Sequence, residues 1–154
     1  MFYVTTSRKP SLTTKRLCRL LAALLPRGVY ENRGKKGIED IFERAKSLGK
    51  RRALLVYEQN GNPSSISFMK INGSWEWLEP EIKISGVKMG TAKIREQPEG
   101  MRISGERKRE LARLFDFDEA ECGECDEDEM TEIRAGAKEI TFSRNKKIML
   151  VLKL

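Results

Sequence analysis

The amino-terminal part of the chain alternates between strand-like runs and helix-like stretches, and this alternation constrains the fold more than any other feature. Residues 2–6 (FYVTT), 28–31 (GVYE) and 53–58 (ALLVYE) are rich in aromatic, β-branched and aliphatic side chains, which is typical of strands. Between them, apolar residues recur at helical spacing over 17–25 and 38–45. The uninterrupted apolar run at 53–58 predicts a strand that is covered on both faces. This order of elements predicts an α/β fold.

Further strands and one more helix are expected beyond this unit. The pair Asn72-Gly73 is typical of a tight hairpin turn. The basic amphipathic stretches at 13–26 and 105–117 resemble each other, which suggests an internal duplication with halves of about 1–80 and 81–154. The expected architecture is an α/β sandwich with a mixed sheet. The later strands are expected at 64–71, 74–78, 82–89, 138–142 and 147–154, and the later helix at 105–115.

Charge is segregated along the chain. The net charge of +7 and the pI of about 9.4 favour a polyanionic partner. Residues 1–52 hold 14 Lys and Arg against 4 Asp and Glu, a net of +10, whereas residues 105–132 hold 4 against 12, a net of −8. The last 22 residues hold 6 against 1. A nucleic-acid contact is therefore expected mainly in the amino-terminal part.

The residue types exclude several classes of function. The chain has no histidine, so Ser-His-Asp and Cys-His catalysis and a His-ligated zinc site are impossible. No pair of carboxylates is singled out by its spacing, and neither a P-loop nor another cofactor fingerprint is present. No long apolar run and no signal peptide are recognisable, so we expect a cytoplasmic protein without a membrane span. We expect a binding module with no catalytic site, cofactor, metal or small-molecule substrate.

The string NRGKKG at 32–37 is the first candidate for binding. It combines Arg33, Lys35 and Lys36 with glycine, directly before a predicted helix. Glycine lets the backbone approach a ligand, and a helix N-terminus presents N–H groups and a partial positive charge. Phosphate groups of a nucleic acid fit these features. Acidic residues in the first helical turn already offset the positive end of the helix dipole, so the cations would supply most of the attraction for phosphate. A solvated surface loop is the alternative.

The string TSRKPS at 6–11 repeats this pattern before the first helix. Ser7 offers a hydroxyl group, and Arg8 and Lys9 offer charge. Loops that leave neighbouring parallel strands at the same edge converge, and open α/β sheets bind ligands there. The two strings are therefore expected to form one surface. The basic run at 50–52 either makes a second contact area or caps the last carbonyl groups of the preceding helix.

Two further features have competing interpretations. Trp75 and Trp77 lie on one face of a predicted strand, where they either stack bases or, more commonly, form core or strand–helix contacts. Cys122 and Cys125 form a C-x-x-C motif within the acidic segment 116–132. A structural zinc needs four ligands, and nearby carboxylates raise the pKa of a thiol. An exposed acidic loop is therefore expected in place of a metal or redox centre.

Several stretches together resemble Brix-domain proteins, a superfamily of ribosome-biogenesis factors, and in particular its short archaeal members. TTSRKPS (5–11), a Leu-rich helix ending in LLP (24–26) and NRGKKG (32–37) occur in the family's order. LLVYEQNGNPSSISF (54–68) resembles the next family segment, a buried strand followed by a turn and another strand. RISGERKRELARLF (102–115) resembles a later basic helix that has been likened to a nucleic-acid-binding region of bacterial sigma factors. The acidic C-x-x-C segment has no counterpart in this pattern.

This resemblance implies an rRNA-binding factor that acts in rRNA processing or ribosomal subunit assembly without catalysis. Its implied partners are rRNA and also ribosomal proteins or other assembly factors. It also implies a single Brix domain over 1–154, a sandwich of two related α/β halves similar to the anticodon-binding domain of class II aminoacyl-tRNA synthetases.

The resemblance and the charge pattern together predict the binding residues. The residues that match the family motifs are Ser7, Arg8, Asn32, Arg33 and Gly34, and the adjoining cations are Lys9, Lys35 and Lys36. A second candidate surface is the basic helix with Arg107, Lys108, Arg109 and Arg113.

A different class of function is the alternative. The acidic segment 116–132 contains ten acidic residues and neither Lys nor Arg. Such a segment suits a protein-interaction adaptor that binds basic ribosomal proteins. An RNA binder should bind an rRNA fragment with a steep salt dependence, whereas an adaptor should not.

Overall fold

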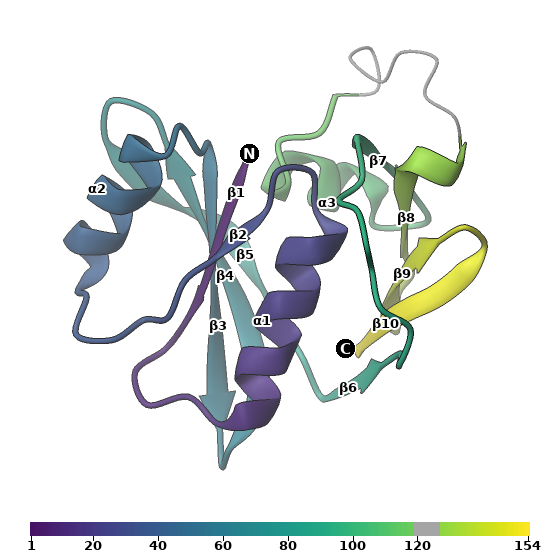
Figure 1. Cartoon of the computed structure of the whole chain (residues 1–154), viewed down its shortest axis with the longest axis horizontal. Coiled ribbons are helices and arrows are strands. Elements are labelled where there is room, and N and C mark those ends of the chain that lie inside the picture. Colours follow the sequence, from purple (N-terminus) through teal and green to yellow (C-terminus); the bar gives the residue numbers. More distant parts are fainter. Residues whose placement is uncertain (119–126) are drawn as a thin grey trace.

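The computed structural model describes residues 1–118 and 127–154 of the chain. The elements of its first half are β1 (Phe2–Thr6), α1 (Leu12–Leu24), β2 (Val29–Tyr30), α2 (Ile38–Ser47), β3 (Arg52–Gln59), β4 (Asn62–Ile71) and β5 (Trp75–Lys83). Those of the second half are β6 (Gly86–Met89), β7 (Gly100–Ser104), α3 (Lys108–Leu114), a short 3₁₀ helix (Glu127–Glu129), β8 (Met130–Ala135), β9 (Glu139–Arg144) and β10 (Lys147–Lys153). The strands form two five-stranded sheets, ordered β2-β1-β3-β4-β5 and β6-β10-β9-β8-β7 (Figure 1). The predicted α/β class is confirmed, with two mixed sheets where one was expected.

The first sheet has a helix on each face. β1 pairs in parallel with β2 and β3, and β3, β4 and β5 pair in antiparallel order. α1 connects β1 to β2 and α2 connects β2 to β3, and the two helices lie on opposite faces of the sheet (Figure 1). Neighbouring residues of β3 face opposite helices, so that Leu54 packs in the cluster with α1 and Leu55 in the cluster with α2. Both are fully buried, which confirms the prediction of a strand covered on both faces.

The first helix forms where its leucine stripe predicts it. Leu17, Leu21 and Leu24 are fully buried in a cluster that also contains side chains of both sheets. Ser11 is the N-cap, and its Oγ accepts a hydrogen bond from the backbone N–H of Thr14 at 3.3 Å. Burial of one leucine side chain contributes about 1.5–3 kcal/mol. Burial of the leucine stripe therefore stabilises the packing of α1 between the two sheets.

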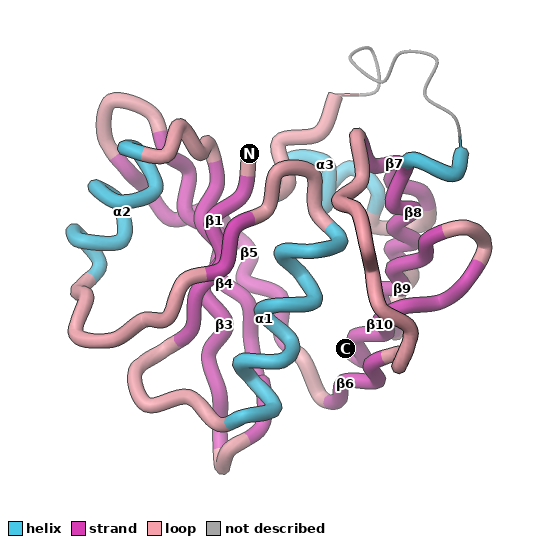
Figure 2. The backbone as a smooth tube through the Cα atoms, viewed as in Figure 1, coloured by secondary structure: helices cyan, strands magenta, loops and turns pink. Residues whose placement is uncertain are grey.

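The helices and sheets form layers. Figure 2 shows α2, the first sheet, α1 together with α3, and the second sheet in succession across the view. One continuous core cluster joins α1 and α3 to both sheets, and a smaller one lies between α2 and the first sheet. Within the described residues, no helix covers the outer face of the second sheet (Figure 2). The two sheets thus share one core but differ in their coverage.

Two strands of the second sheet were not expected from the sequence. β7 and β8 form a parallel pair connected through α3. In β8, Met130, Ile133 and Ala135 are buried, whereas Glu132 and Arg134 are exposed. The strand begins inside the segment that was interpreted as an acidic loop, and its alternation of apolar and charged residues was therefore overlooked. Of that segment, residues 119–126, with Cys122 and Cys125, lie outside the described residues.

The run at 82–89 is not one strand. Its first part belongs to β5 and its second part to β6, in the other sheet. The backbone N–H of Ile84 still donates to the carbonyl of Ser64 at 2.8 Å, whereas that of Ser85 donates to Lys153 at 2.7 Å. Side-chain alternation continues through this crossing, so the periodicity does not reveal that the hydrogen-bonding partner changes.

The two sheets share part of their topology. The order β1-β3-β4-β5 contains one parallel pair followed by two antiparallel pairs, and the order β7-β8-β9-β10 does the same. The chain leaves the first sheet after Lys83 and enters the second at Gly86, close to the expected division of the halves. This shared order is what two related halves would produce, and the duplication itself stays a prediction.

A buried cation links the halves. The side chain of Arg52 at the start of β3 is 8% exposed. Its Nε donates to the carbonyl of Leu114 at 3.0 Å and its Nη2 to that of Arg113 at 3.3 Å. The basic run at 50–52 thus includes a helix cap, but Arg52 caps α3 and not the helix that precedes it in the sequence.

Candidate nucleic-acid interface

Two basic loops meet at the carboxyl ends of the parallel strands. The first basic loop (residues 7–11) follows β1, and the second basic loop (residues 31–37) follows β2. Because β1 and β2 are parallel, both loops leave the same end of the first sheet (Figure 1). The guanidinium of Arg33 connects the second loop to the end of β1, directly before the first loop, since its Nη1 donates to the carbonyl of Thr6 at 3.1 Å. The predicted convergence is confirmed.

Arg33 is a structural link within this surface. It is 7% exposed, and its Nε donates to the carbonyl of Lys36 at 2.6 Å. Its guanidinium therefore holds the second basic loop closed and ties it to the end of β1. Gly34 beside it has φ +54, a conformation that glycine adopts without strain. We assign both residues a role in shaping the loop, and direct RNA contact by either stays a prediction.

Lys36 points toward a polar cluster beneath the second loop. Its Nζ donates to the carbonyl of Asn32 at 3.0 Å and lies 3.8 Å from Oε1 of Glu31. Glu31 also accepts hydrogen bonds from Arg44 and from the hydroxyl of Tyr3. The hydrogen bond from Arg44 is the main cause that lowers the pKa of Glu31, while burial raises that of Tyr3. The positive charge of Lys36 is thus partly compensated inside the protein.

Three predicted cations remain available to a ligand. Arg8, Lys9 and Lys35 are exposed, and their side chains form neither a hydrogen bond nor an ion pair with the described residues. Asn32 is exposed as well, and its Oδ1 accepts a hydrogen bond from the hydroxyl of Tyr30 at 2.8 Å. The half-buried Ser7 donates its backbone N–H to Val56. These exposed cations project from a frame that the inward-facing residues hold.

The helix N-termini are already capped by carboxylates. Oδ2 of Asp40 accepts the backbone N–H of Gly37 at 2.9 Å at the start of α2. Glu58 on β3 accepts the backbone N–H of Ser11 at 3.0 Å at the start of α1. Negative charge at a helix N-terminus offsets the helix dipole. Attraction of an anion to this surface therefore depends on the lysine and arginine side chains rather than on the helix ends.

The outward face of α1 continues the basic surface, which the sequence predictions did not include. The guanidinium of Arg19 lies 5.5 Å from the centre of the Tyr30 ring, and Tyr30 in turn bonds Asn32. Arg16 and Arg19 are both exposed on α1. The sequence does show that one side of this amphipathic helix is basic. That this side lies beside the second loop depends on the parallel pairing of β1 and β2.

The second candidate surface on α3 is separate from the basic loops. The cap by Arg52 places the C-terminal end of α3 near the start of β3, whereas the basic loops lie at the ends of the parallel strands. Arg107 forms two hydrogen bonds with Glu110, and Arg113 donates to the carbonyl of Glu79. Lys108 is half-buried and Arg109 is exposed. An RNA contact on α3 stays a prediction.

The tryptophans form a strand–helix contact. Trp75 and Trp77 lie on the same face of β5, with ring centres 5.6 Å apart in an edge-to-face arrangement. Nε1 of Trp75 donates to Glu39 on α2 at 2.8 Å, and Trp75 packs against the cluster beneath that helix. Trp77 is 40% exposed at the border of this contact. The geometry matches the more common of the two interpretations.

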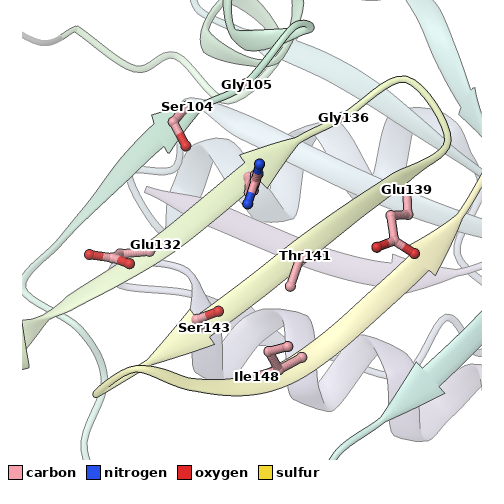
Figure 3. Close-up of a pocket in the computed structure, with 9 residues that line it drawn as sticks. Ser104, Gly105, Glu132, Gly136, Glu139, Thr141, Ser143 and Ile148 are labelled. Carbon is pink, nitrogen blue, oxygen red and sulfur yellow. The ribbon is translucent and has the colours of Figure 1, made fainter.

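A broad depression lies on the open face of the second sheet (Figure 3). Its volume is about 940 Å³, and Glu132 and Glu139 lie at its opposite ends. Thr141 and Ser143 line the floor between them (Figure 3). General acid–base catalysis by two carboxylates needs both within reach of one reacting group. This arrangement does not bring them together.

The described residues contain little that suggests a metal or redox centre. Cys18 is buried, its Sγ lies 3.6 Å from the carbonyl of Thr5, and burial raises the pKa of its thiol to about 12. Among residues 1–118 and 127–154, no three His, Cys, Asp or Glu side chains gather in a way that would hold a metal. In the same residues, every helix is too short or too polar to span a bilayer.

Comparison with known proteins relates parts of the chain to described relatives. A segment of 63 residues is 44% identical to a probable Brix domain-containing ribosomal biogenesis protein from Saccharolobus solfataricus, and covers 41% of this chain and 37% of that protein. A segment of 90 residues is 33% identical to the protein of the same description from Thermococcus kodakarensis, over 58% of this chain and 43% of that protein. The chain resembles archaeal Brix-domain proteins. The matched part thus spans less than half the length of these relatives.

Solved structures agree with this resemblance at the level of the fold. The crystal structure of a probable ribosomal biogenesis protein from Aeropyrum pernix superposes with a TM-score of 0.80 at 20% identity, over 99% of this chain and 93% of that one. The structure of Mil, an archaeal Imp4-like protein, superposes with a TM-score of 0.74 at 19% identity, over 99% and 96%. No family model matches the chain. The predicted resemblance to Brix-domain proteins is confirmed, whereas the likeness to the anticodon-binding domain of aminoacyl-tRNA synthetases stays a prediction.

Proposed function

We propose that this chain is an rRNA-binding factor that acts in ribosome assembly without catalysis. The observation that carries the proposal is the convergence of two basic loops at one end of the first sheet, with Arg8, Lys9 and Lys35 exposed and unpaired within the described residues. The similarity to proteins named as ribosomal biogenesis proteins supports rRNA as the polyanion. Other assembly factors or ribosomal proteins are further proposed partners.

The proposed contact is with the RNA backbone. Exposed lysine and arginine side chains bind phosphates irrespective of base sequence, so they position RNA but do not specify it. Arg33 and Lys36 hold the loops in shape from beneath. Arg19 and Tyr30 extend the surface along α1 and add an aromatic ring to it. Recognition of RNA shape by backbone contacts fits this arrangement better than recognition of individual bases.

Titration with salt tests the proposal. The double variant Arg8→Ala/Lys35→Ala should bind an rRNA fragment more weakly and flatten the plot of log affinity against log salt by about 1.4–1.8, the value for two phosphate contacts. Arg134→Ala/Lys138→Ala is a matched control, because it removes one exposed arginine and one exposed lysine from the second sheet and its turn. A loss no larger than that of the control would place the RNA site elsewhere.

The adaptor alternative predicts a different result. In that case wild-type protein would bind basic ribosomal proteins through residues 116–132 and would show no salt-dependent RNA binding. Asp116 of this segment is already engaged, since its carboxylate lies 2.9 Å from Nε of Arg51 and 3.5 Å from Nη2 of Arg52. At least one of the ten carboxylates of the segment is therefore paired inside the protein.

A further inference from the structure

A second basic depression lies in the other half of the molecule. It is bordered by the strap (residues 90–99), which connects β6 to β7, and by the tip of the β9–β10 hairpin. Its volume is about 460 Å³. We call this depression the strap pocket. The charged side chains that line it are Lys93, Arg95, Arg144 and Lys147, with Glu96 and Asp128.

The strap is held in place near both of its ends. Gly90 donates its backbone N–H to Met149 at 2.8 Å, and Glu99 donates to Glu129 at 2.8 Å. Nε2 of Gln97 donates to the carbonyl of Gly28 at 2.6 Å and also to that of Ala22 at the end of α1. The strap therefore runs alongside α1 (Figure 1). These bonds fix the pocket relative to the basic face of α1.

Arg144 on the pocket wall has unused hydrogen-bonding capacity. Among the described residues, its Nη1 and Nη2 make only long contacts of 3.4 Å, to the carbonyls of Glu96 and Asp128. Its Nε is buried and has no partner among the described residues. A guanidinium has five N–H donors and pairs most strongly with carboxylate or phosphate. A bound anion would give the two Nη groups stronger, charge-assisted partners than these distant carbonyls.

Within the part of the chain that the structure describes, the cations of the strap pocket are not paired with the acidic residues that line it. Lys93, Arg95 and Lys147 are exposed. Within the described residues, none of the pocket's four cations forms an ion pair with Glu96 or Asp128. Among the described residues that line the depression, four cations face two carboxylates. The excess of positive charge points to an anionic ligand, and the open form of the depression suits a chain that passes through it.

We propose that the strap pocket binds a phosphate group of the RNA backbone as a second contact, separate from the basic loops. This inference rests on the proposed function. An RNA that reached both sites would cross the outward face of α1, where Arg16 and Arg19 are exposed. The protein would then hold one RNA across its two halves, with the Gln97 hydrogen bonds setting the spacing of the contacts.

The test compares three double variants by titration with one rRNA fragment at several salt concentrations. Arg95→Ala/Lys147→Ala should flatten the salt slope by about 0.7–1.8, for one to two lost phosphate contacts. Arg134→Ala/Lys138→Ala, the matched control, should change it less. If the strap-pocket variant behaves like the control while Arg8→Ala/Lys35→Ala weakens binding, the strap pocket is refuted and the proposed function stands. If wild-type protein does not bind RNA, the proposed function itself fails.

A second readout does not depend on RNA. The Nε–H resonance of Arg144 should shift and saturate when inorganic phosphate is added at constant ionic strength, because phosphate would engage its guanidinium. Chloride at the same ionic strength should leave it in place. The shift should weaken in Arg95→Ala/Lys147→Ala. An Arg144 signal that phosphate does not move would overturn the assignment.

Discussion

The two sheets of this protein differ in coverage, and the difference can be traced to their side chains. The first sheet has α1 on one face and α2 on the other, and five consecutive residues of β3, from Arg52 to Val56, are buried. The second sheet packs one face on the common core, and β8 alternates between buried and exposed residues. Its outer face carries polar and charged side chains such as Glu132 and Arg134. A sheet with such a face can border water, whereas the apolar faces of the first sheet need a layer on each side.

The largest expected effect contrasts one residue from each sheet. Leu55→Ala removes a fully buried side chain between the first sheet and α2, and should lower the free energy of unfolding by about 2–5 kcal/mol. Ile148→Ala on the outer face of the second sheet, where Ile148 is 58% exposed, should change it by no more than about 0.5 kcal/mol. Urea titration of both variants measures this. Equal losses would mean that the outer face of the second sheet is covered in solution.

A smaller effect separates residues that shape the second basic loop from those that face a ligand. Arg33→Met leaves the carbonyls of Thr6 and Lys36 without their donors and should cost about 1–3 kcal/mol of stability. Lys35→Ala is a surface change and should stay within about 0.5 kcal/mol, yet it should weaken RNA binding. Urea titrations together with RNA titrations distinguish the two. If Arg33→Met is as stable as Lys35→Ala, Arg33 is not the link described here.

The smallest effect concerns Glu58 on β3, whose carboxylate caps the start of α1 and so connects this helix to the first sheet. Glu58→Gln should cost about 0.5–1 kcal/mol at neutral pH, as the loss of a charged N-cap partner does. Hydrogen bonds from the Thr14 hydroxyl and the Ser11 backbone lower the pKa of Glu58 below its ordinary value of 4.5. Its stabilisation is therefore present above pH 4.5 and is lost as the pH falls through the lowered pKa. Unfolding curves of both proteins over this range should converge in acid, and a constant gap would show that the carboxylate charge is not responsible.

Local pattern predicted most elements of the first half. The leucine stripe of α1, the apolar face of α2 and the covered strand β3 each carry a strong periodic signal over their own residues. Buried and exposed residues alternate in both β7 and β8, but β8 was missed because it begins within the acidic segment, and β7 because it directly precedes the basic run of α3. The passage of the chain from the first sheet to the second at Ile84 and Ser85 was not predicted, because side-chain alternation does not show which strand is the hydrogen-bonding partner.

The candidate site was predictable in location but not in the roles of its residues. Basic residues in loops after two parallel strands had to meet at one end of the sheet. The sequence did not show that Arg33 and Lys36 turn toward carbonyl groups and Glu31, since all the cations of the loop look alike there. The sequence did not show the strap pocket, because Lys93 and Arg95 are about fifty residues away from Arg144 along the chain.

The sequence by itself determined the α/β class, the amphipathic helices, the concentration of positive charge in the amino-terminal part and the absence of histidine chemistry. These are properties of composition and of short-range periodicity, which each segment carries alone. Only the tertiary structure decided that there are two sheets, that Arg52 caps a helix of the other half and that the strap brings distant cations to one pocket. Such features arise from contacts between residues far apart in the chain, which depend on how the whole core packs.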